Sequence, residues 1–222
     1  MAEYVAVPWW IAFKIPDDLA FTHAALLEPM SIAVHAANRS GIKHGDTGLV
    51  VGTGTIGLLA IRAARLKGAG MVIACDINES RLRIAKALGA DVTVNTSGPD
   101  ALAQILGYAG GLGVDVSFEA VGLSETFKLA ASALRLGGRL VAIGNVHREI
   151  EINLQELVSR ELTFTGSCAS SGELRSCAEL ISSGRVQVKS LISEVLPLKD
   201  GPRAFERLLK AEEDLLKIVL EP

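Results

Sequence analysis

Three observations in the sequence predict an α/β fold built on a doubly wound parallel sheet. Six short runs are rich in β-branched residues and lack polar alternation, which is typical of strands covered on both faces. Helical stretches alternate with these runs, and such alternation favours a doubly wound sheet. Several helical stretches stop at glycines, in "KALGAD", "LRLGGRL" and "ISSGRV", where a left-handed C-cap residue is expected.

The predicted elements follow one another along the middle of the chain. The expected strands are "GLVVGTG" (48–54), "MVIACD" (71–76), "DVTVN" (91–95), "VDVSFEA" (114–120), "GRLVAIG" (138–144) and "LTFTGS" (162–167). The expected helices cover 56–68, 78–89, 100–108, 123–136, a weak stretch near 153–160, and 172–183. A glycine cluster at 107–115 precedes a strand rather than a helix, so we interpret it as a loop.

The two ends of the chain differ from this pattern. Residues 1–16, "MAEYVAVPWWIAFKIP", predict one or two strands with an aromatic stretch at Trp9, Trp10 and Phe13. Residues 186–222 predict a strand, a helix and a last strand. Neither end has an obvious place in the parallel sheet.

Composition and charge exclude several classes of partner. The 222 residues include 22 Lys and Arg against 25 Asp and Glu, so the chain has no basic footprint for nucleic acid. No apolar run reaches the length of a membrane span, and the first residues lack the basic start of a signal peptide. We therefore predict a cytoplasmic protein. Cys75, Cys168 and Cys177 lack CxxC spacing, and we interpret them as small buried hydrophobic residues.

The sharpest motif is "VVGTGTIGLLAIRAA", in which Gly52, Gly54 and Gly57 form GxGxxG between an apolar strand and an apolar helix. Gly52 would allow a tight turn, Gly54 would let the backbone approach a pyrophosphate, and Gly57 would let helix and strand pack closely. The amides of Thr55 and Ile56 would then face the phosphates at the helix N-terminus. A tight turn without a ligand is the alternative interpretation.

An acid follows this motif at the distance that dinucleotide binding requires. Asp76 lies 19 residues beyond Gly57, at the end of the second strand, where a carboxylate can accept hydrogen bonds from the adenosine ribose. It would repel a 2′-phosphate, so NAD is favoured over NADP. Arg81 is close enough to lie against adenine and could offset part of that repulsion. The alternative for Asp76 is an ordinary surface acid.

The whole chain resembles the C-terminal two thirds of a zinc-containing medium-chain dehydrogenase/reductase of the sorbitol, butanediol and threonine dehydrogenase type. The stretches that carry the resemblance are "AEYVAVP", "KIPDDLAFTHAALLEPMSIAVHA", "GDTGLVVGTGTIGLLAIRAA", "CDINESRLRIAKALGAD", "GVDVSFEAVG", "LRLGGRLVAIGN" and "LLKIVLEP". The resemblance implies a six-stranded NAD-binding Rossmann domain over 28–185. It also implies that residues 1–27 and 186–222 are parts of a GroES-like catalytic domain.

The resemblance assigns further residues to the nicotinamide end of the cofactor. It implies that Val121 and Gly122 lie beside the ring and that the backbone of Ile143, Gly144 and Asn145 holds the carboxamide. Ordinary strand-end residues are the alternative interpretation of these positions.

Glu28, in "ALLEPMSIAVHA", matches a glutamate that is similar to a catalytic zinc ligand in polyol dehydrogenases. Without the resemblance, the sequence indicates an acid at a helix N-terminus with Pro29 as the first helical residue, which needs no metal. His35 follows seven residues later, a helical rise of about 10 Å, which is too far for both side chains to share one ion comfortably. We interpret His35 as a packed or hydrogen-bonded helix residue.

The other zinc ligands of the family lie in an N-terminal domain that this sequence does not contain. In a complete enzyme, zinc would polarise an alcohol oxygen, and hydride would pass to NAD. A catalytic zinc needs about three protein ligands, so one carboxylate cannot hold it. We therefore expect a truncated enzyme that binds NAD(H) without catalysis.

Several alternatives stay open. Residues 165–172 and 192–198 depart from the sorbitol dehydrogenase pattern, which disfavours sorbitol itself as the substrate and leaves butanediol, threonine or a sugar-acid alcohol. A stand-alone dinucleotide-binding module or sensor is the second interpretation, and a zinc-independent reductase related to quinone reductases is the third. We also expect a homo-oligomer, either a dimer or a tetramer, with residues 162–167 continuing the sheet across a two-fold axis.

Overall fold

The computed structural model describes residues 1–210 and 215–222, and the chain forms two compact units. One unit comprises Met1–Glu28 and Gly172–Pro222, and the other comprises Pro29–Ser171. Among the described helices, none combines the length and apolar character that crossing a membrane would require.

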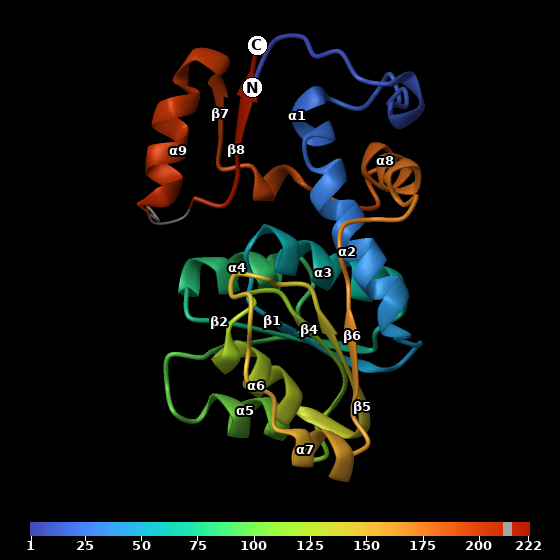
Figure 1. The fold of residues 1–222 in the computed structure, drawn as a ribbon, viewed down its shortest axis with the longest axis vertical. Helices are drawn as coiled ribbons and strands as arrows, with labels where there is room; N and C mark the ends of the chain where they lie inside the picture. The colour runs from blue at the N-terminus through green and yellow to red at the C-terminus, as the bar shows by residue number, and fades with distance from the viewer. Residues whose placement is uncertain (211–214) are drawn as a thin grey trace. The chain divides into compact units, whose positions relative to one another are not determined.

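The larger unit contains a six-stranded sheet in the order β3-β2-β1-β4-β5-β6, in which all neighbouring strands are parallel (Figure 1). The strand order reverses beside β1, and in open α/β sheets this is the point where ligands bind, outside the carboxyl ends of the strands. The predicted doubly wound fold is confirmed. The strands are β1 (Thr47–Val51), β2 (Met71–Asp76), β3 (Val92–Asn95), β4 (Val114–Glu119), β5 (Leu134–Ala142) and β6 (Thr163–Gly166).

Helices cover both faces of this sheet. In Figure 1, α3 and α4 lie on one face, and α5 and α6 lie on the other. Leu49 and Val51 belong to the core cluster that includes residues of α5 and α6, whereas Val50 approaches Gly57 of α3. Alternate residues of β1 therefore meet opposite layers, which is why its sequence is apolar without alternation. The helices of this unit are α2 (Leu27–Ser40, which begins just before it), α3 (Thr55–Leu66), α4 (Glu79–Ala87), α5 (Ala101–Tyr108), α6 (Ser124–Ser132) and α7 (Leu154–Ser159).

One helix is shorter than the sequence predicts. Residues 134–136, expected in the helix over 123–136, belong instead to β5, because Leu134 pairs with Val114 of β4 across a register shift. Tertiary pairing with the neighbouring strand therefore overrides the local helical pattern.

The smaller unit contains a two-stranded parallel sheet formed by β7 (Glu194–Pro197) and β8 (Ile218–Glu221), with α9 (Gly201–Leu209) between them in the chain. This agrees with the predicted strand, helix and strand. The unit also contains α1 (Phe21–Ala24) and α8 (Leu174–Ser182). Ser182 Oγ donates to Asp18 Oδ1 at 2.9 Å, which links the two segments of the chain that make up this unit.

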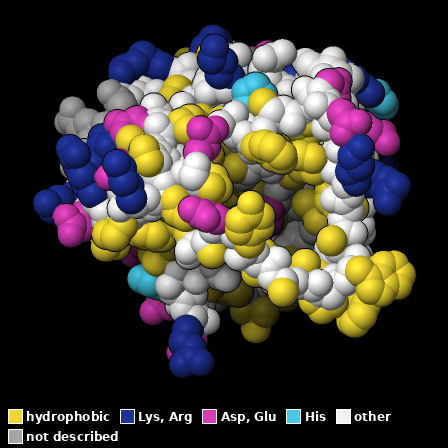
Figure 2. Space-filling view, turned by 90° about the horizontal axis from the view of Figure 1, so that it is seen from above, with side chains coloured by type: hydrophobic (Ala, Val, Ile, Leu, Met, Phe, Trp, Pro, Cys, Tyr) yellow, Lys and Arg dark blue, Asp and Glu magenta, His cyan; other side chains and the backbone are white. Residues whose placement is uncertain are grey.

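The prediction of strands over residues 1–16 is wrong. This segment contains a 3₁₀ turn at Trp9–Ile11 and no strand, because none of its residues pairs with another strand. Trp9 and Trp10 remain exposed and meet edge to face, with ring centroids 6.2 Å apart. Figure 2 shows a face of the molecule on which hydrophobic side chains lie exposed among charged ones.

Candidate functional site

The glycine-rich loop joins β1 to α3 at the carboxyl edge of the sheet. Gly52 has a φ of +90°, which L-residues with side chains rarely adopt. A Cβ on Gly57 would lie 1.8 Å from the carbonyl oxygen of Gly52, so the helix can approach the strand only with glycine at this position. A Cβ on Gly54 would meet nothing within 4 Å. The loop is therefore tightly packed at Gly57 and has free space at Gly54, where a ligand's pyrophosphate would lie.

The helix begins directly at this open side. Thr55 and Ile56 are the first two residues of α3, and the N-cap is Gly54, which offers no side-chain cap. The first amides of a helix lack intrahelical acceptors, and the helix dipole makes this end favourable for an anion.

Asp76 ends β2 and holds the glycine-rich loop. Its Oδ2 accepts hydrogen bonds from Thr53 N at 2.6 Å and Thr53 Oγ1 at 2.9 Å, and its Oδ1 accepts from Asn78 N at 3.0 Å. The side chain is largely buried, and these donors compensate the carboxylate for lost water. Oδ1 accepts only one of these hydrogen bonds and retains capacity for a further one, such as one from a ribose hydroxyl.

A pocket of about 460 Å³ opens beside Asp76. Gly52, Asp76 and Arg81, all singled out from the sequence, line it together. Val121 also lines it, so the pocket reaches from the end of β2 to the loop after β4. The other lining residues are Val51, Cys75, Ile77, Thr96, Leu123, Glu125, Thr126 and Leu129.

The residues expected at the nicotinamide end belong to two loops that touch each other. A Cβ on Gly122 would lie 2.4 Å from Asn145 N, and a Cβ on Gly144 would lie 2.2 Å from the Val121 carbonyl carbon. His147 N also donates to Gly122 O at 3.0 Å. The loops that follow β4 and β5 therefore pack backbone against backbone.

A second pocket of the larger unit, of about 670 Å³, lies at the ends of β5 and β6. Ile143, Gly144 and Asn145 line it, together with Ile56 of α3. Most of the expected cofactor residues thus line one of two pockets at the carboxyl edge of one sheet, whereas Gly54, Thr55, Gly57 and Gly122 line neither. The remaining lining residues are Ile32, His35, Arg39, Ala142, Gly166, Ser167, Cys168 and Ala169.

The sequence analysis missed three residues of this region: Thr53, Glu119 and Thr126. Thr53 fastens Asp76, and Glu119 accepts hydrogen bonds from the following loop and from the Thr126 hydroxyl. A signal for Glu119 was available, because an acid stands at the end of an otherwise apolar strand in "VDVSFEAVG".

Glu28 lies in the first turn of α2 and is exposed. The expectation that Pro29 begins the helix is wrong, because α2 starts at Leu27 and Pro29 is its third residue. Proline is still tolerated there, since an amide in the first turn has no acceptor within the helix. Within residues 1–210 and 215–222, no three His, Cys, Asp or Glu side chains come together as a metal site. The described residues therefore do not fit a catalytic zinc.

The three thiols do not share one environment. Burial raises the pKa of Cys75 to about 12, with a further contribution from the charge of Asp76. Burial likewise raises the pKa of Cys177 to about 11. The prediction that all three are buried is wrong for Cys168, which is exposed because it lies beyond the end of β6.

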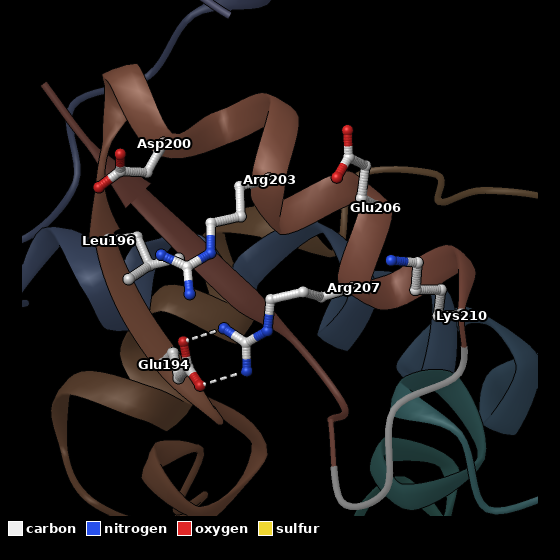
Figure 3. A pocket seen from close by; sticks show the side chains of 7 residues that line it. All are labelled: Glu194, Leu196, Asp200, Arg203, Glu206, Arg207 and Lys210. Carbon is white, nitrogen blue, oxygen red and sulfur yellow. Dashed lines mark hydrogen bonds and ion pairs between the residues drawn. The ribbon is translucent and has the colours of Figure 1, made fainter.

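The smaller unit has a charged pocket of its own, of about 600 Å³, between β7 and α9 (Figure 3). Arg207 binds Glu194 through two hydrogen bonds of 2.6 and 2.7 Å. The hydrogen bond from Arg207 lowers the pKa of the Glu194 carboxyl below its ordinary value. Figure 3 shows Arg203 projecting from the same helix and Lys210 at its C-terminal end. None of the residues with expected cofactor roles lines this pocket, so it is separate from the dinucleotide motif.

Comparison with known proteins identifies the relatives of this chain. The family model described as zinc-binding dehydrogenase matches residues 55–183. Sorbitol dehydrogenase of Bacillus subtilis (strain 168) is 33% identical over 221 residues, which are 99% of this chain and 63% of that protein. The chain therefore spans just under two thirds of that relative's length.

Solved structures agree with this comparison. The 2R,3R-butanediol dehydrogenase of Bacillus subtilis has a TM-score of 0.86 and 31% identity, and the match covers 95% of this chain and 60% of that one. A protein of Sinorhizobium meliloti 1021 bound to NADP has a TM-score of 0.87 and 32% identity, with 95% and 62% covered.

Proposed function

The chain belongs to the zinc-binding dehydrogenase family, and we propose that it binds NAD(H) along the carboxyl edge of its six-stranded sheet. One observation carries this proposal: a glycine-rich loop, closed at Gly57 and open at Gly54, is fastened through Thr53 to the largely buried carboxylate of Asp76. A pyrophosphate site and a ribose acceptor are thus held in one rigid arrangement.

Each half of the cofactor has its own residues in this proposal. The pyrophosphate lies against Gly54 and the first amides of α3, and Asp76 accepts hydrogen bonds from the ribose hydroxyls while Arg81 lies against adenine. The nicotinamide half extends towards the pocket that Ile143, Gly144 and Asn145 line, past Val121 and Gly122. When bound, NAD supplies the acceptor for a hydride from a secondary alcohol.

The smaller unit has a proposed role in a longer protein. We assign residues 1–27 and 186–222 to a catalytic domain and residues 28–185 to the cofactor domain. The zinc ligands would come from further residues of such a protein, since the described residues do not form a metal site. Glu28 would contribute to such a metal site only together with those further ligands. The substrate class is an alcohol or polyol, in keeping with the names of the relatives.

Assembly into a dimer or tetramer is also proposed. β6 is one of the two edge strands of the sheet, and among the described residues it pairs with β5 alone. Its outer backbone groups can pair with the same strand of a second copy, which would continue the sheet.

Calorimetric titration of the purified chain with NADH tests the proposed function, and NADPH serves as the comparison ligand. We expect saturable binding of NADH and weaker binding of NADPH. A second assay follows NADH formation from NAD with added zinc and a panel of polyols, diols and threonine. Binding without turnover supports a cofactor-binding chain, and turnover would show that this chain forms its own metal site. Absence of NADH binding would refute the proposal.

A further inference from the structure

Glu119, the last residue of β4, is a fully buried acid that the residues proposed to hold the cofactor do not include. Its carboxylate accepts hydrogen bonds from Val121 N at 2.9 Å, from Gly122 N at 2.8 and 3.1 Å, and from Thr126 Oγ1 at 2.9 Å. These donors are neutral, and they replace the water that a buried carboxylate loses. The side chain therefore turns towards the loop that follows β4 and holds it in place through these hydrogen bonds.

The backbone of the same residue fixes a second loop. Glu119 O accepts hydrogen bonds from Ile143 N at 2.8 Å and from Gly144 N at 3.0 Å. One residue thus holds the loop after β4 through its carboxylate and the loop after β5 through its carbonyl oxygen. These are the two loops whose backbones touch at Gly122 and Gly144.

The glycine-rich loop joins this arrangement through Val121. A Cβ on Gly52 would lie 2.4 Å from Val121 Cγ2, so the valine side chain occupies space that only glycine leaves open. Because Glu119 binds Val121 N, it also determines where this side chain meets Gly52. The loop after β4, which the Glu119 carboxylate holds, therefore contacts the glycine-rich loop at Gly52 and the loop after β5 at Gly144.

We propose that Glu119 is a positioning residue for the nicotinamide half of the cofactor, acting through Val121 and Gly122, which it holds against Gly144. The inference rests on the proposed function, since it concerns one half of the same dinucleotide. Glu119 lines neither pocket of the sheet edge, so it acts through the residues that it holds. Its loss should weaken contacts to the nicotinamide and leave the adenosine side, held by Asp76, unchanged.

Two ligands distinguish effects on the nicotinamide half of the cofactor from effects on the adenosine half. They are NADH and ADP-ribose, which lacks the nicotinamide ring. Both are titrated into the unaltered chain and into Glu119→Gln, which keeps the size of the side chain but turns an NH₂ donor towards amide N–H groups. We expect NADH affinity to decrease by about tenfold or more, the effect of losing one hydrogen bond to a charged group. ADP-ribose affinity should stay within about twofold, since Asp76 is held by Thr53 and Asn78 and makes no hydrogen bond with Glu119.

Matched variants exclude a general loss of structure. Ser117→Ala removes a buried hydroxyl from the same strand, one for which no partner occurs among the described residues, and it should leave both affinities unchanged. Glu119→Asp keeps the charge but shortens the side chain by one methylene group, and it is the replacement test variant if Glu119→Gln does not fold. A positioning role predicts that it too lowers NADH affinity selectively.

Each outcome decides between the two proposals. Selective loss of NADH affinity supports the role of Glu119, whereas equal changes for both ligands, or none, overturn it. If the unaltered chain binds both ligands equally well, the nicotinamide contributes nothing, and the role fails while nucleotide binding stands. If it binds neither ligand, the proposed function fails, and the role of Glu119 fails with it.

Discussion

Two buried carboxylates flank β1 at the carboxyl edge of the sheet, and they differ in what they face. Asp76 ends β2 and Glu119 ends β4, and both strands pair with β1. Each carboxylate accepts a hydrogen bond from a backbone amide of a neighbouring loop. Asp76 is 9% exposed and lines a pocket of about 460 Å³, whereas Glu119 is 0% exposed and lines neither pocket of this edge.

Accessibility separates an acid that faces a pocket from an acid of similar chemistry that only fixes a loop. Asp76 keeps acceptor capacity turned towards a pocket, so it can recognise a hydroxyl group there. The Glu119 carboxylate accepts hydrogen bonds from three protein donors, so this residue can act only through the residues that it holds. Both satisfy the requirement that a buried charge be hydrogen-bonded.

Replacing each acid by leucine provides the largest test of this difference. Glu119→Leu leaves buried donors without an acceptor, and we expect the free energy of unfolding to decrease by about 3 kcal/mol or more. Asp76→Leu, the matched change, leaves two donors on the buried Thr53 and one on the partly exposed Asn78, so a smaller loss of about 1–2 kcal/mol is expected. Urea denaturation followed by circular dichroism measures both values. Equal losses would contradict the distinction.

The glycine-rich loop between the two acids offers a second test. In Gly57→Ala the new Cβ would lie 1.8 Å from Gly52 O, and overpacking of this kind costs about 1–3 kcal/mol of stability. In Gly54→Ala the Cβ meets no protein atom within 4 Å, so the unfolding free energy should change little. NADH affinity should decrease in both variants, which calorimetry would detect. If Gly54→Ala binds NADH normally, the open side of the loop is not the pyrophosphate site.

Asp76→Asn tests whether the charge of Asp76 determines the preference for NADH over NADPH. The amide oxygen can still accept a hydrogen bond from Thr53, so the fold should be retained, but the negative charge that repels a 2′-phosphate is removed. We expect the preference for NADH over NADPH to decrease by about tenfold, which equals about 1.4 kcal/mol. Parallel titrations with the two cofactors measure this ratio. An unchanged ratio would mean that another residue discriminates between the ribose groups.

The smallest expected effect concerns Cys75, a thiol beside Asp76 whose pKa is raised by burial. At pH 8, a thiol with a pKa of about 12 is a thiolate in only about one molecule in ten thousand. We therefore expect Cys75 to be inert towards Ellman's reagent in the folded chain, whereas the exposed Cys168 reacts. Cys168→Ser should remove the fast phase. A fast phase that persists would show that the edge opens to solvent.

Local patterns predicted much of the fold and part of the candidate site. The apolar strands, the glycine-rich loop and Asp76 at the end of β2 are all set by residues close together in sequence, and the structure has them where expected. The strands predicted over residues 1–16 failed because a strand depends on a neighbour to pair with. The exposure of Cys168 depends on where β6 ends, which composition does not specify.

The sequence by itself determined the βα alternation, the parallel sheet and the position of the dinucleotide motif, because hydrophobic periodicity and glycine spacing are local properties. Only the tertiary structure decided which acids are buried and what they hold. Thr53 meets Asp76 across 23 residues, and Glu119 binds Gly144 across 25. Such contacts arise when separate strands align in one sheet, and no window of sequence contains both partners in a recognisable pattern.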